Sequence, residues 1–221
     1  KNFIFMNSGC LEAHVDAGLS QYRSSVTLAL PVKPLVSAGE FGSNPKFDSN
    51  PKRIVSIGRI QRDFKSYNWT FLKDLSGLAK THDLVWEIYG TGSESDLVSL
   101  RSSIREVDLA DKVKLMGELP YSDMARVLRG AFAFVGMGTA AVEAASAGVP
   151  TIVATAYTNT SHTYGFLHQL PFPCVGEKLH DSITGDRIGK KLAELLQSSE
   201  PDWQIISNLD QKHTRGFDIS S

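Results

Sequence analysis

The stretch from Phe134 to Ala154, FVGMGTAAVEAASAGVPTIVA, carries the clearest structural signal in the chain. It predicts a short apolar strand, a glycine turn, a helix of small residues and a second strand. Gly136 and Gly138 allow a tight turn and leave no side chain in the way of a ligand. Thr139 is expected to cap the helix, and Gly148 to end it. The unpaired N–H groups at the start of such a helix form an anion site.

Glu143 is the candidate binding residue of this helix. It follows Thr139 by four residues, so the two side chains share one helix face, about one turn or roughly 5.4 Å apart. A phosphate at Thr139 would bring a sugar hydroxyl within reach of Glu143, and a carboxylate that accepts from two vicinal hydroxyls is a common way to hold a ribose. Alternatively, Glu143 only stabilises the first half of the helix. The stretch alone leaves both interpretations open, because glycine turns before helices are common.

The composition is that of an ordinary globular protein. The 221 residues are 42% apolar and 21% charged, with a net charge of −1. This balance implies no general attraction to nucleic acid, and no apolar run approaches the roughly 18 residues that span a membrane. Cys10 and Cys174 lie far apart without a CxxC spacing. The expected location is therefore the reducing cytoplasm.

Strands and helices are expected to alternate through the middle of the chain. Strict alternation is typical of an α/β fold with a doubly wound, Rossmann-like parallel sheet covered by helices on both faces. Ligands of such sheets bind at the carboxyl ends of the strands. Residues 157–173 are expected to form a loop. The predicted strands are 53–57, 84–89, 113–116, 131–135 and 151–154, and the predicted helices are 69–79, 96–107, 122–128, 183–196 and 203–212.

This pattern divides the chain into four expected segments. Residues 1–36 are expected to be either the remnant of a preceding domain or an entry segment, because the chain opens abruptly on a strand-like segment. Residues 37–52 are rich in Ser, Gly, Asn and Pro and predict a linker. Residues 53–200 are the predicted Rossmann-like domain. Residues 201–221 are predicted as a C-terminal helix followed by a partly disordered tail.

Two cations lie at the expected ligand edge of the sheet. Arg59 follows the first predicted strand, and Lys65 lies six residues further on. Two cations that face a helix N-terminus would neutralise a diphosphate. The alternative is that both are solvated loop charges, and for Lys65 the neighbouring Arg62 and Lys52 are competing candidates.

Other catalytic signatures are missing from the sequence. The six histidines show no metal-ligand spacing such as HExxH, so no metal is expected. A GxSxG elbow and a Walker lysine motif are also absent. His162 and His168 lie in the expected 157–173 loop, where they can face a substrate or have no role. Trp86 and Trp203 are expected in the core.

Four segments in order resemble the C-terminal domain of GT-B glycosyltransferases, in particular the large, mostly retaining group 1 family. They are SIGR, IYGTGSESDLVSL, VKLMGELPYSDMARVL and GMGTAAVEAASAGVPTIVA. The resemblance covers residues 31–154. It implies one half of a GT-B fold that binds a nucleotide-diphosphate sugar as donor. It also implies glycosyl transfer, without a metal or other cofactor, to a glycan or lipid-linked acceptor.

The resemblance also implies roles for matching residues. Arg59 and Lys65 would be the catalytic cations on the donor diphosphate, and Glu143 would hold the ribose hydroxyls. The remaining donor-binding positions, which act largely through their backbone, are Gly58, Leu119, Gly136, Met137, Gly138 and Thr139.

Two features depart from the family pattern. The family usually carries two glutamates separated by seven residues; Glu143 matches the second, but Val135 occupies the position of the first, which normally contacts the transferred sugar. In addition, the acceptor domain precedes the donor domain in this family, and only a remnant of it is expected in residues 1–36. This chain alone is therefore expected to bind the donor but to transfer poorly.

Two alternative functions stay open. One is a nucleotide-sugar epimerase on the same architecture, and the other is a non-catalytic nucleotide-sugar-binding module, which Val135 favours. The expected partners are a nucleotide sugar and an acceptor, without nucleic acid. Peripheral association with the inner face of the membrane is left open, because in this fold basic or amphipathic surfaces often lie on the preceding domain.

Overall fold

The computed structural model describes residues 4–5, 18, 26–27, 32, 35, 47–179 and 183–218. Most of the predicted segment 1–36 and of the linker 37–52 lies outside these residues, as does Cys10, so the predicted division of the chain stays a prediction. Two short strands, β1 (Ile4–Phe5) and β2 (Val26–Thr27), pair in parallel. No helix in the described part of the chain combines the length and the apolar character needed to cross a membrane.

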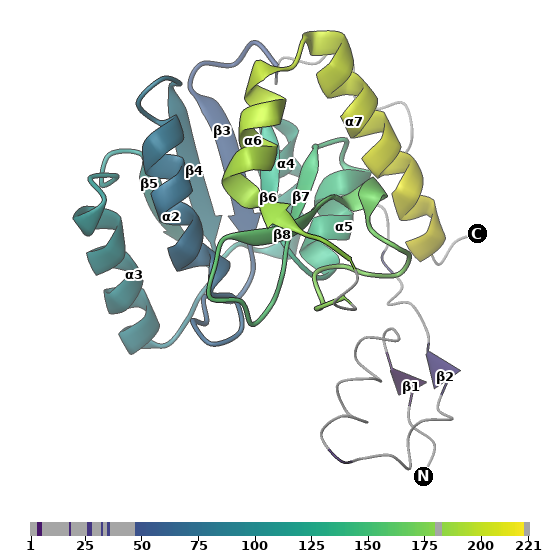
Figure 1. The fold of residues 1–221 in the computed structure, drawn as a ribbon, viewed down its shortest axis with the longest axis horizontal. Coiled ribbons are helices and arrows are strands. Elements are labelled where there is room, and N and C mark those ends of the chain that lie inside the picture. The colour runs from purple at the N-terminus through teal and green to yellow at the C-terminus, as the bar shows by residue number, and fades with distance from the viewer. Residues whose placement is uncertain are drawn as a thin grey trace.

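A seven-stranded sheet forms the centre of the molecule (Figure 1). Its strand order is β5-β4-β3-β6-β7-β8-β9, and the first five strands of this order are parallel. Successive strands run outward from β3 in one direction and from β6 in the other, so the topological switch point lies between β3 and β6. The predicted α/β doubly wound fold is thus confirmed. The strands are β3 (Lys52–Ile57), β4 (Leu84–Tyr89), β5 (Val113–Gly117), β6 (Ala133–Gly136), β7 (Thr151–Ala154), β8 (His162–Phe166) and β9 (Asp186–Arg187).

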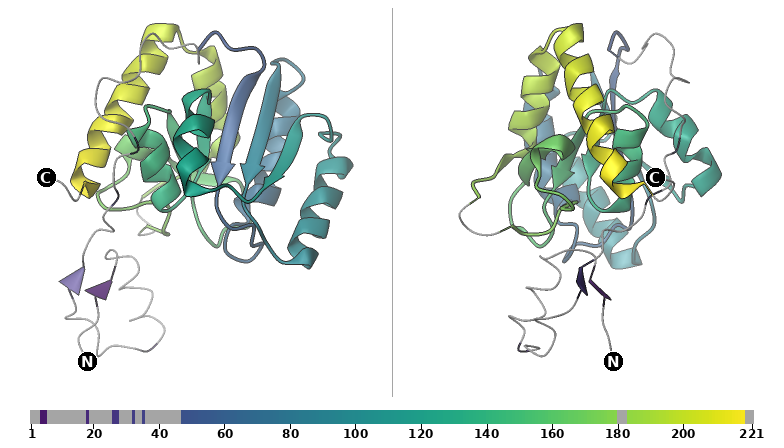
Figure 2. Two further views of the ribbon diagram at one scale, coloured as in Figure 1. Left: turned by 180° about the vertical axis from the view of Figure 1, so that it is seen from behind. Right: turned by 90° about the vertical axis from the view of Figure 1, so that its right-hand side faces the viewer.

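Helices cover both faces of the sheet, as Figures 1 and 2 show. One face packs against α2, α3 and α6, and Trp86 is fully buried there beside the ring of Phe71. The other face packs against α4 and α5, with α7 beside α5. Because both faces are covered, β6 and β7 are buried throughout, which explains their continuous apolar sequences. The helices are α2 (Tyr67–Leu78), α3 (Glu94–Glu106), α4 (Tyr121–Arg129), α5 (Thr139–Ser146), α6 (Ile188–Gln197) and α7 (Glu200–His213).

The edge formed by β8 and β9 differs from the prediction. Both strands are antiparallel to their neighbours, and the expected 157–173 loop contains β8 and a short 3-10 helix, η2 (Leu167–Gln169). The sequence of β8, HTYGF, is short and polar, so it gives no apolar signal. Its pairing with β7 and β9 holds it in place instead. The helix expected from residue 183 begins at Ile188, because the two residues before it belong to β9.

The C-terminal part of the domain contacts both the loop before β6 and the residue Val32, which precedes the sheet. Trp203 in α7 is fully buried, as predicted, and its indole N–H donates to the carbonyl of Phe132 at 3.0 Å. In the tail that is predicted to be partly disordered, Thr214–Phe217 form a 3-10 helix, η3, and residues 219–221 lie outside the described residues. The Val32 N–H donates to the Phe217 carbonyl at 2.8 Å, which ties the two segments together.

Candidate functional site

The carboxyl ends of the parallel strands meet at one edge of the sheet, beside the switch point between β3 and β6. Gly58 follows β3 and Gly90 follows β4, and both have positive φ angles, of 146° and 141°. A Cβ atom on Gly90 would collide with the carbonyl of Gly58, so the strand ends approach more closely than a side chain would permit. This close packing fixes the backbone on which the candidate site is built.

Lys65 and Arg59 lie near each other at the end of β3. A Cβ atom on Gly58 would meet the Nζ of Lys65, which places the ammonium group directly against the strand end. Burial lowers the pKa of Lys65, and the nearby charge of Arg59 lowers it further. Neither cation has a carboxylate within ion-pair distance in the described part of the chain. Two like charges held together without a counterion form a site for an anion.

The two competing cations are engaged elsewhere. Lys52 lies at the opposite, amino end of β3, where its ammonium bonds the Phe47 carbonyl and lies 4.9 Å from the centre of the Phe132 ring. The Arg62 guanidinium donates to the Ser99 hydroxyl at 2.8 Å. Of the candidate lysines and arginines near the first strand, Arg59 and Lys65 are therefore the pair available at the ligand edge.

The glycine turn after β6 forms the N-terminus of α5. Gly138 has a φ of 73° and is the N-cap, and Thr139 is the first helical residue, so the expected cap at Thr139 is wrong by one position. A left-handed φ suits glycine, which explains the shift. The Gly138 N–H is already bonded to the Val175 carbonyl at 2.7 Å. The Thr139 and Ala140 N–H groups donate to no acceptor among residues 47–179 and 183–218 and can bind an anion.

The other positions of this turn contribute less directly. Gly136 is the last residue of β6, and the ring of Phe134 occupies the space next to it. Met137 is buried. Gly148 has the left-handed φ of 67° expected of the residue that follows the helix, so this prediction is confirmed. Open space for a ligand lies at Gly138, where an added Cβ atom would meet no other described atom within 4 Å.

Glu143 lies on α5 next to the first residue of α4. Its carboxylate is half-buried and lies near the Tyr121 side chain. Burial raises the pKa of Glu143, and the nearby Tyr121 hydroxyl partly offsets the effect. Leu119, two residues before Tyr121, packs on the α4 and α5 side of the sheet. Sequence reasoning missed Tyr121, although its position after the glycine end of β5 pointed to the ligand edge.

The residues of this edge fit one known family. The chain matches the family model "Glycosyl transferases group 1" over residues 40–163. The chain belongs to this family. None of the curated proteins matches the chain.

Three solved structures with the fold of this group 1 domain are distant from it in sequence. A glycosyltransferase from Rickettsia africae has a TM-score of 0.70 at 12% identity, with 100% of this chain and 60% of that chain covered. HepE from Anabaena, in complex with UDP and glucose, has a TM-score of 0.65 at 14% identity, with 99% of this chain and 60% of that chain covered. TarM from S. aureus, in complex with UDP, has a TM-score of 0.61 at 14% identity over 97% and 40%. The chain thus spans between 40% and 60% of the length of these structures.

Val135 departs from the group 1 pattern in structure as well as in sequence. Its side chain is fully buried within β6, in the apolar cluster that contains Trp86. Its carbonyl accepts from the Ser56 hydroxyl at 2.5 Å, and that hydroxyl accepts from the Trp86 indole at 2.8 Å. A carboxylate at this position would be buried without a partner, so the strand cannot present a sugar-binding glutamate here.

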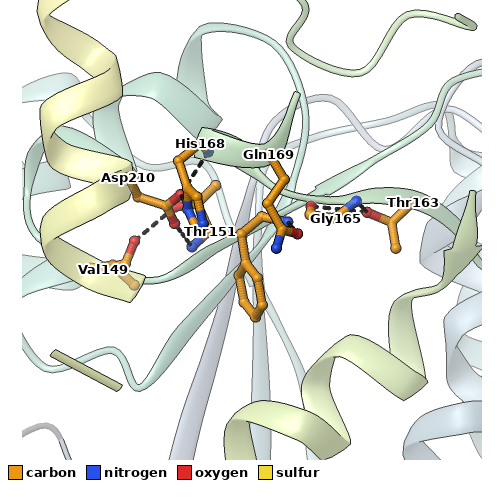
Figure 3. A network of polar contacts seen from close by, with 8 residues as sticks. Val149, Thr151, Thr163, Gly165, His168, Gln169 and Asp210 are labelled. Atoms are coloured by element: carbon orange, nitrogen blue, oxygen red, sulfur yellow. Dashed lines mark hydrogen bonds and ion pairs between the residues drawn. The ribbon is translucent and has the colours of Figure 1, made fainter. Parts of the chain in front are cut away.

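His168 lies away from this edge, whereas His162 lies beside Thr155, the residue that follows β7. The buried Asp210 carboxylate accepts from the His168 ring at 2.7 Å, the His168 N–H at 2.9 Å and the Thr151 N–H at 2.8 Å (Figure 3). Thr151 begins β7, so His168 lies at the amino end of the sheet and serves its structure. The His162 ring bonds the Thr155 hydroxyl at 2.9 Å. In the part of the chain that the structure describes, no group of three or more His, Cys, Asp or Glu side chains is placed to hold a metal ion.

Proposed function

We propose that this chain is the donor-binding half of a glycosyltransferase that uses a nucleotide-diphosphate sugar. The observation that carries the proposal is the placement of two groups on the neighbouring strands β3 and β6. Lys65 and Arg59, which have no carboxylate partner among the described residues, follow β3, and the Thr139 and Ala140 N–H groups, which have no described acceptor, follow β6. Both groups lie at the switch point of the sheet, where this architecture binds its ligands. The diphosphate would lie between them.

In this proposal, catalysis is electrostatic. The leaving nucleoside diphosphate gains negative charge as its bond to the sugar breaks. The Lys65 ammonium, the Arg59 guanidinium and the α5 N–H groups would stabilise this charge without a metal ion. The loss of one such donor typically raises the barrier by about 3 kcal/mol, or about a hundredfold in rate.

The nucleoside would bind along the α4 and α5 side of the site. The half-buried Glu143 carboxylate would accept from the ribose hydroxyls, and the backbone around Leu119 would border the base. Three solved structures of similar fold, TarM of S. aureus, GtfA of pneumococcus and HepE of Anabaena, contain UDP. UDP is therefore the first nucleotide to test.

The acceptor would be a glycan or a lipid-linked saccharide, bound largely by a second domain. This part of the proposal rests on the family, since the chain spans only part of the length of its structural neighbours. Location in the cytoplasm, with or without association with the inner face of the membrane, stays a prediction from composition and family.

A second function is favoured by one observation. The fully buried Val135 removes the carboxylate that normally contacts the transferred sugar, which supports a non-catalytic nucleotide-sugar-binding module. The family match weakens the case for an epimerase.

Calorimetric titration of the chain with UDP, GDP and ADP, and then with their sugar conjugates, tests the proposal. We expect one nucleotide to bind, and Glu143→Ala to weaken that binding by about 1.5–3 kcal/mol, as for a lost hydrogen bond to a charged group. Glu106→Ala, on the exposed side of α3, is the matched control and should leave the affinity unchanged.

The outcomes separate the two functions. Nucleotide binding together with release of UDP from a UDP-sugar in the presence of an acceptor extract supports the transferase. Binding without turnover in the full-length protein supports the non-catalytic module. An affinity that Glu143→Ala leaves unchanged would remove Glu143 from the site.

A further inference from the structure

A hollow at the start of α2 has no part in the proposed donor site. Its volume is about 450 Å³, and the residues that line it include Arg62, Asp63, Trp69, Tyr157 and Asn159. They come from the loop before α2, the first turn of α2 and the loop after β7. All three segments meet at the carboxyl edge of the sheet, so the hollow opens on the same edge as the cation pair.

The hollow is preformed by contacts between its two loops. The Tyr157 N–H donates to the Phe64 carbonyl at 3.2 Å, and the Ser66 hydroxyl donates to the Thr158 carbonyl at 2.5 Å. The rings of Phe64 and Tyr157 pack with their centres 5.0 Å apart. The loop after β7 is thereby fixed to the start of α2, and a ligand would find the walls already in place.

Tyr157 has an unusual backbone and an unusual exposure. Its φ is 54°, in the left-handed region that bulky residues rarely adopt, and 75% of its surface is exposed. A glycine would adopt this φ without strain, and an exposed ring is not needed for the core. Strain retained at an exposed aromatic residue in a hollow is the kind of outlier that points to a binding role.

The polar groups of the hollow suit an uncharged ligand. In the described part of the chain, the Asp63 carboxylate and the Asn159 amide have no hydrogen-bond or ion-pair partner. The Arg62 guanidinium lies over the Trp69 ring, 5.7 Å from its centre. One positive and one negative side chain leave no net charge, and the free carboxylate would repel a phosphate.

We propose that this hollow binds one uncharged sugar residue of the acceptor glycan, an inference that rests on the proposed transferase function. A pyranose ring has one face of C–H groups, which would pack on the exposed Tyr157 ring. Its hydroxyls would donate to Asp63 and exchange hydrogen bonds with the Asn159 amide. The hollow would thus hold the glycan beside the donor diphosphate.

The test is binding of the chain to a printed array of uncharged and anionic oligosaccharides, followed by titration with the strongest uncharged binder. We expect uncharged glycans to be retained, and Tyr157→Ala and Asn159→Ala each to weaken binding about tenfold or more. Ile205→Ala, which removes another exposed apolar side chain, is the matched control and should have no effect. Retention of anionic glycans only, retention of no glycan, or binding that both variants leave unchanged would overturn the proposal.

Two further measurements separate this proposal from its alternatives. Tyr157→Gly relieves the left-handed strain, so its melting temperature should be equal to or higher than that of the unchanged protein while glycan binding is lost. A fall in melting temperature together with retained glycan binding would assign Tyr157 a structural role and overturn the proposal. UDP affinity should be unchanged in Tyr157→Gly, and glycan affinity unchanged in Glu143→Gln. Glycan binding without any nucleotide binding would leave the hollow as a sugar site and refute the donor function instead.

Discussion

Charged groups are paired at the amino ends of the strands in the central sheet but not at the carboxyl ends, which form the ligand edge. At the amino side, Arg53 pairs with Glu87 at 2.8 Å, and the buried Asp210 accepts three hydrogen bonds. At the carboxyl edge, Lys65 lies beside Arg59 without a carboxylate partner in the described residues. The same kinds of side chain thus stabilise the fold at one edge and stay available for a ligand at the other.

The comparison shows that, within one sheet, charged groups at the amino ends of the strands contribute to stability, whereas those at the carboxyl ends are available for function. Satisfied buried charges are costly to disrupt, because removing one partner leaves the other without compensation. Unpaired cations already cost stability in the empty protein, and a bound anion removes that cost. Substitutions at the two ends of the strands should therefore change the free energy of unfolding by different amounts and in opposite directions.

The largest effect is expected at the amino side. Asp210→Ala leaves the Thr151 and His168 donors without their acceptor, so the free energy of unfolding should fall by about 3–5 kcal/mol. Urea unfolding measures this loss. Asp111→Ala, on the surface, should change it little. A loss as small as that of the control would contradict the proposed division between the edges.

An effect of intermediate size, a loss of ligand affinity and not of stability, is expected at the carboxyl edge. Lys65→Ala should weaken UDP binding by about 1.5–3 kcal/mol, since a charged hydrogen bond to phosphate is lost. The free energy of unfolding should stay equal or rise, because a cation held against Arg59 is removed. Calorimetry and urea unfolding measure the two quantities, with Lys73→Ala on the exposed side of α2 as control. Lower stability with unchanged affinity would make Lys65 a structural residue.

The smallest expected effect is a dependence of UDP affinity on pH. The pKa of Lys65 is lowered by burial and by Arg59, so in the empty protein its proton is lost at a lower pH than usual. Only the protonated form attracts the diphosphate. UDP affinity should therefore already fall at pH values below the ordinary lysine range, which lies near 10.4. Lys65→Arg should flatten this dependence, because arginine stays charged. Parallel pH profiles for both proteins would exclude Lys65 as the titrating group.

The sequence predicted best those elements whose signal is local. The β6–α5–β7 unit follows from one continuous stretch, because both strands are buried on both faces and glycines mark the turns. β8 was missed because HTYGF is polar and depends on its neighbouring strands. The N-cap was misplaced by one residue because the φ of Gly138 cannot be read from composition.

The sequence predicted at which edge of the sheet the candidate site lies, but it did not predict the side-chain contacts within the site. The strand ends indicated that Arg59 and Glu143 share that edge. The position of the Lys65 ammonium against Gly58 depends on how the 59–65 loop folds back, which no spacing rule gives. The Tyr121 contact to Glu143 and the His168 contact to Asp210 join residues far apart in the chain, so neither could be expected from local pattern.

The unpaired cations at the end of β3 have a practical consequence for work in solution. A group of positive charges and N–H donors that have no described acceptor attracts small anions from the buffer. Phosphate or sulfate at millimolar concentration would occupy the place of the diphosphate and compete with it. An affinity measured in phosphate buffer would then describe an exchange of anions, whereas a chloride buffer of low ionic strength would report the nucleotide itself.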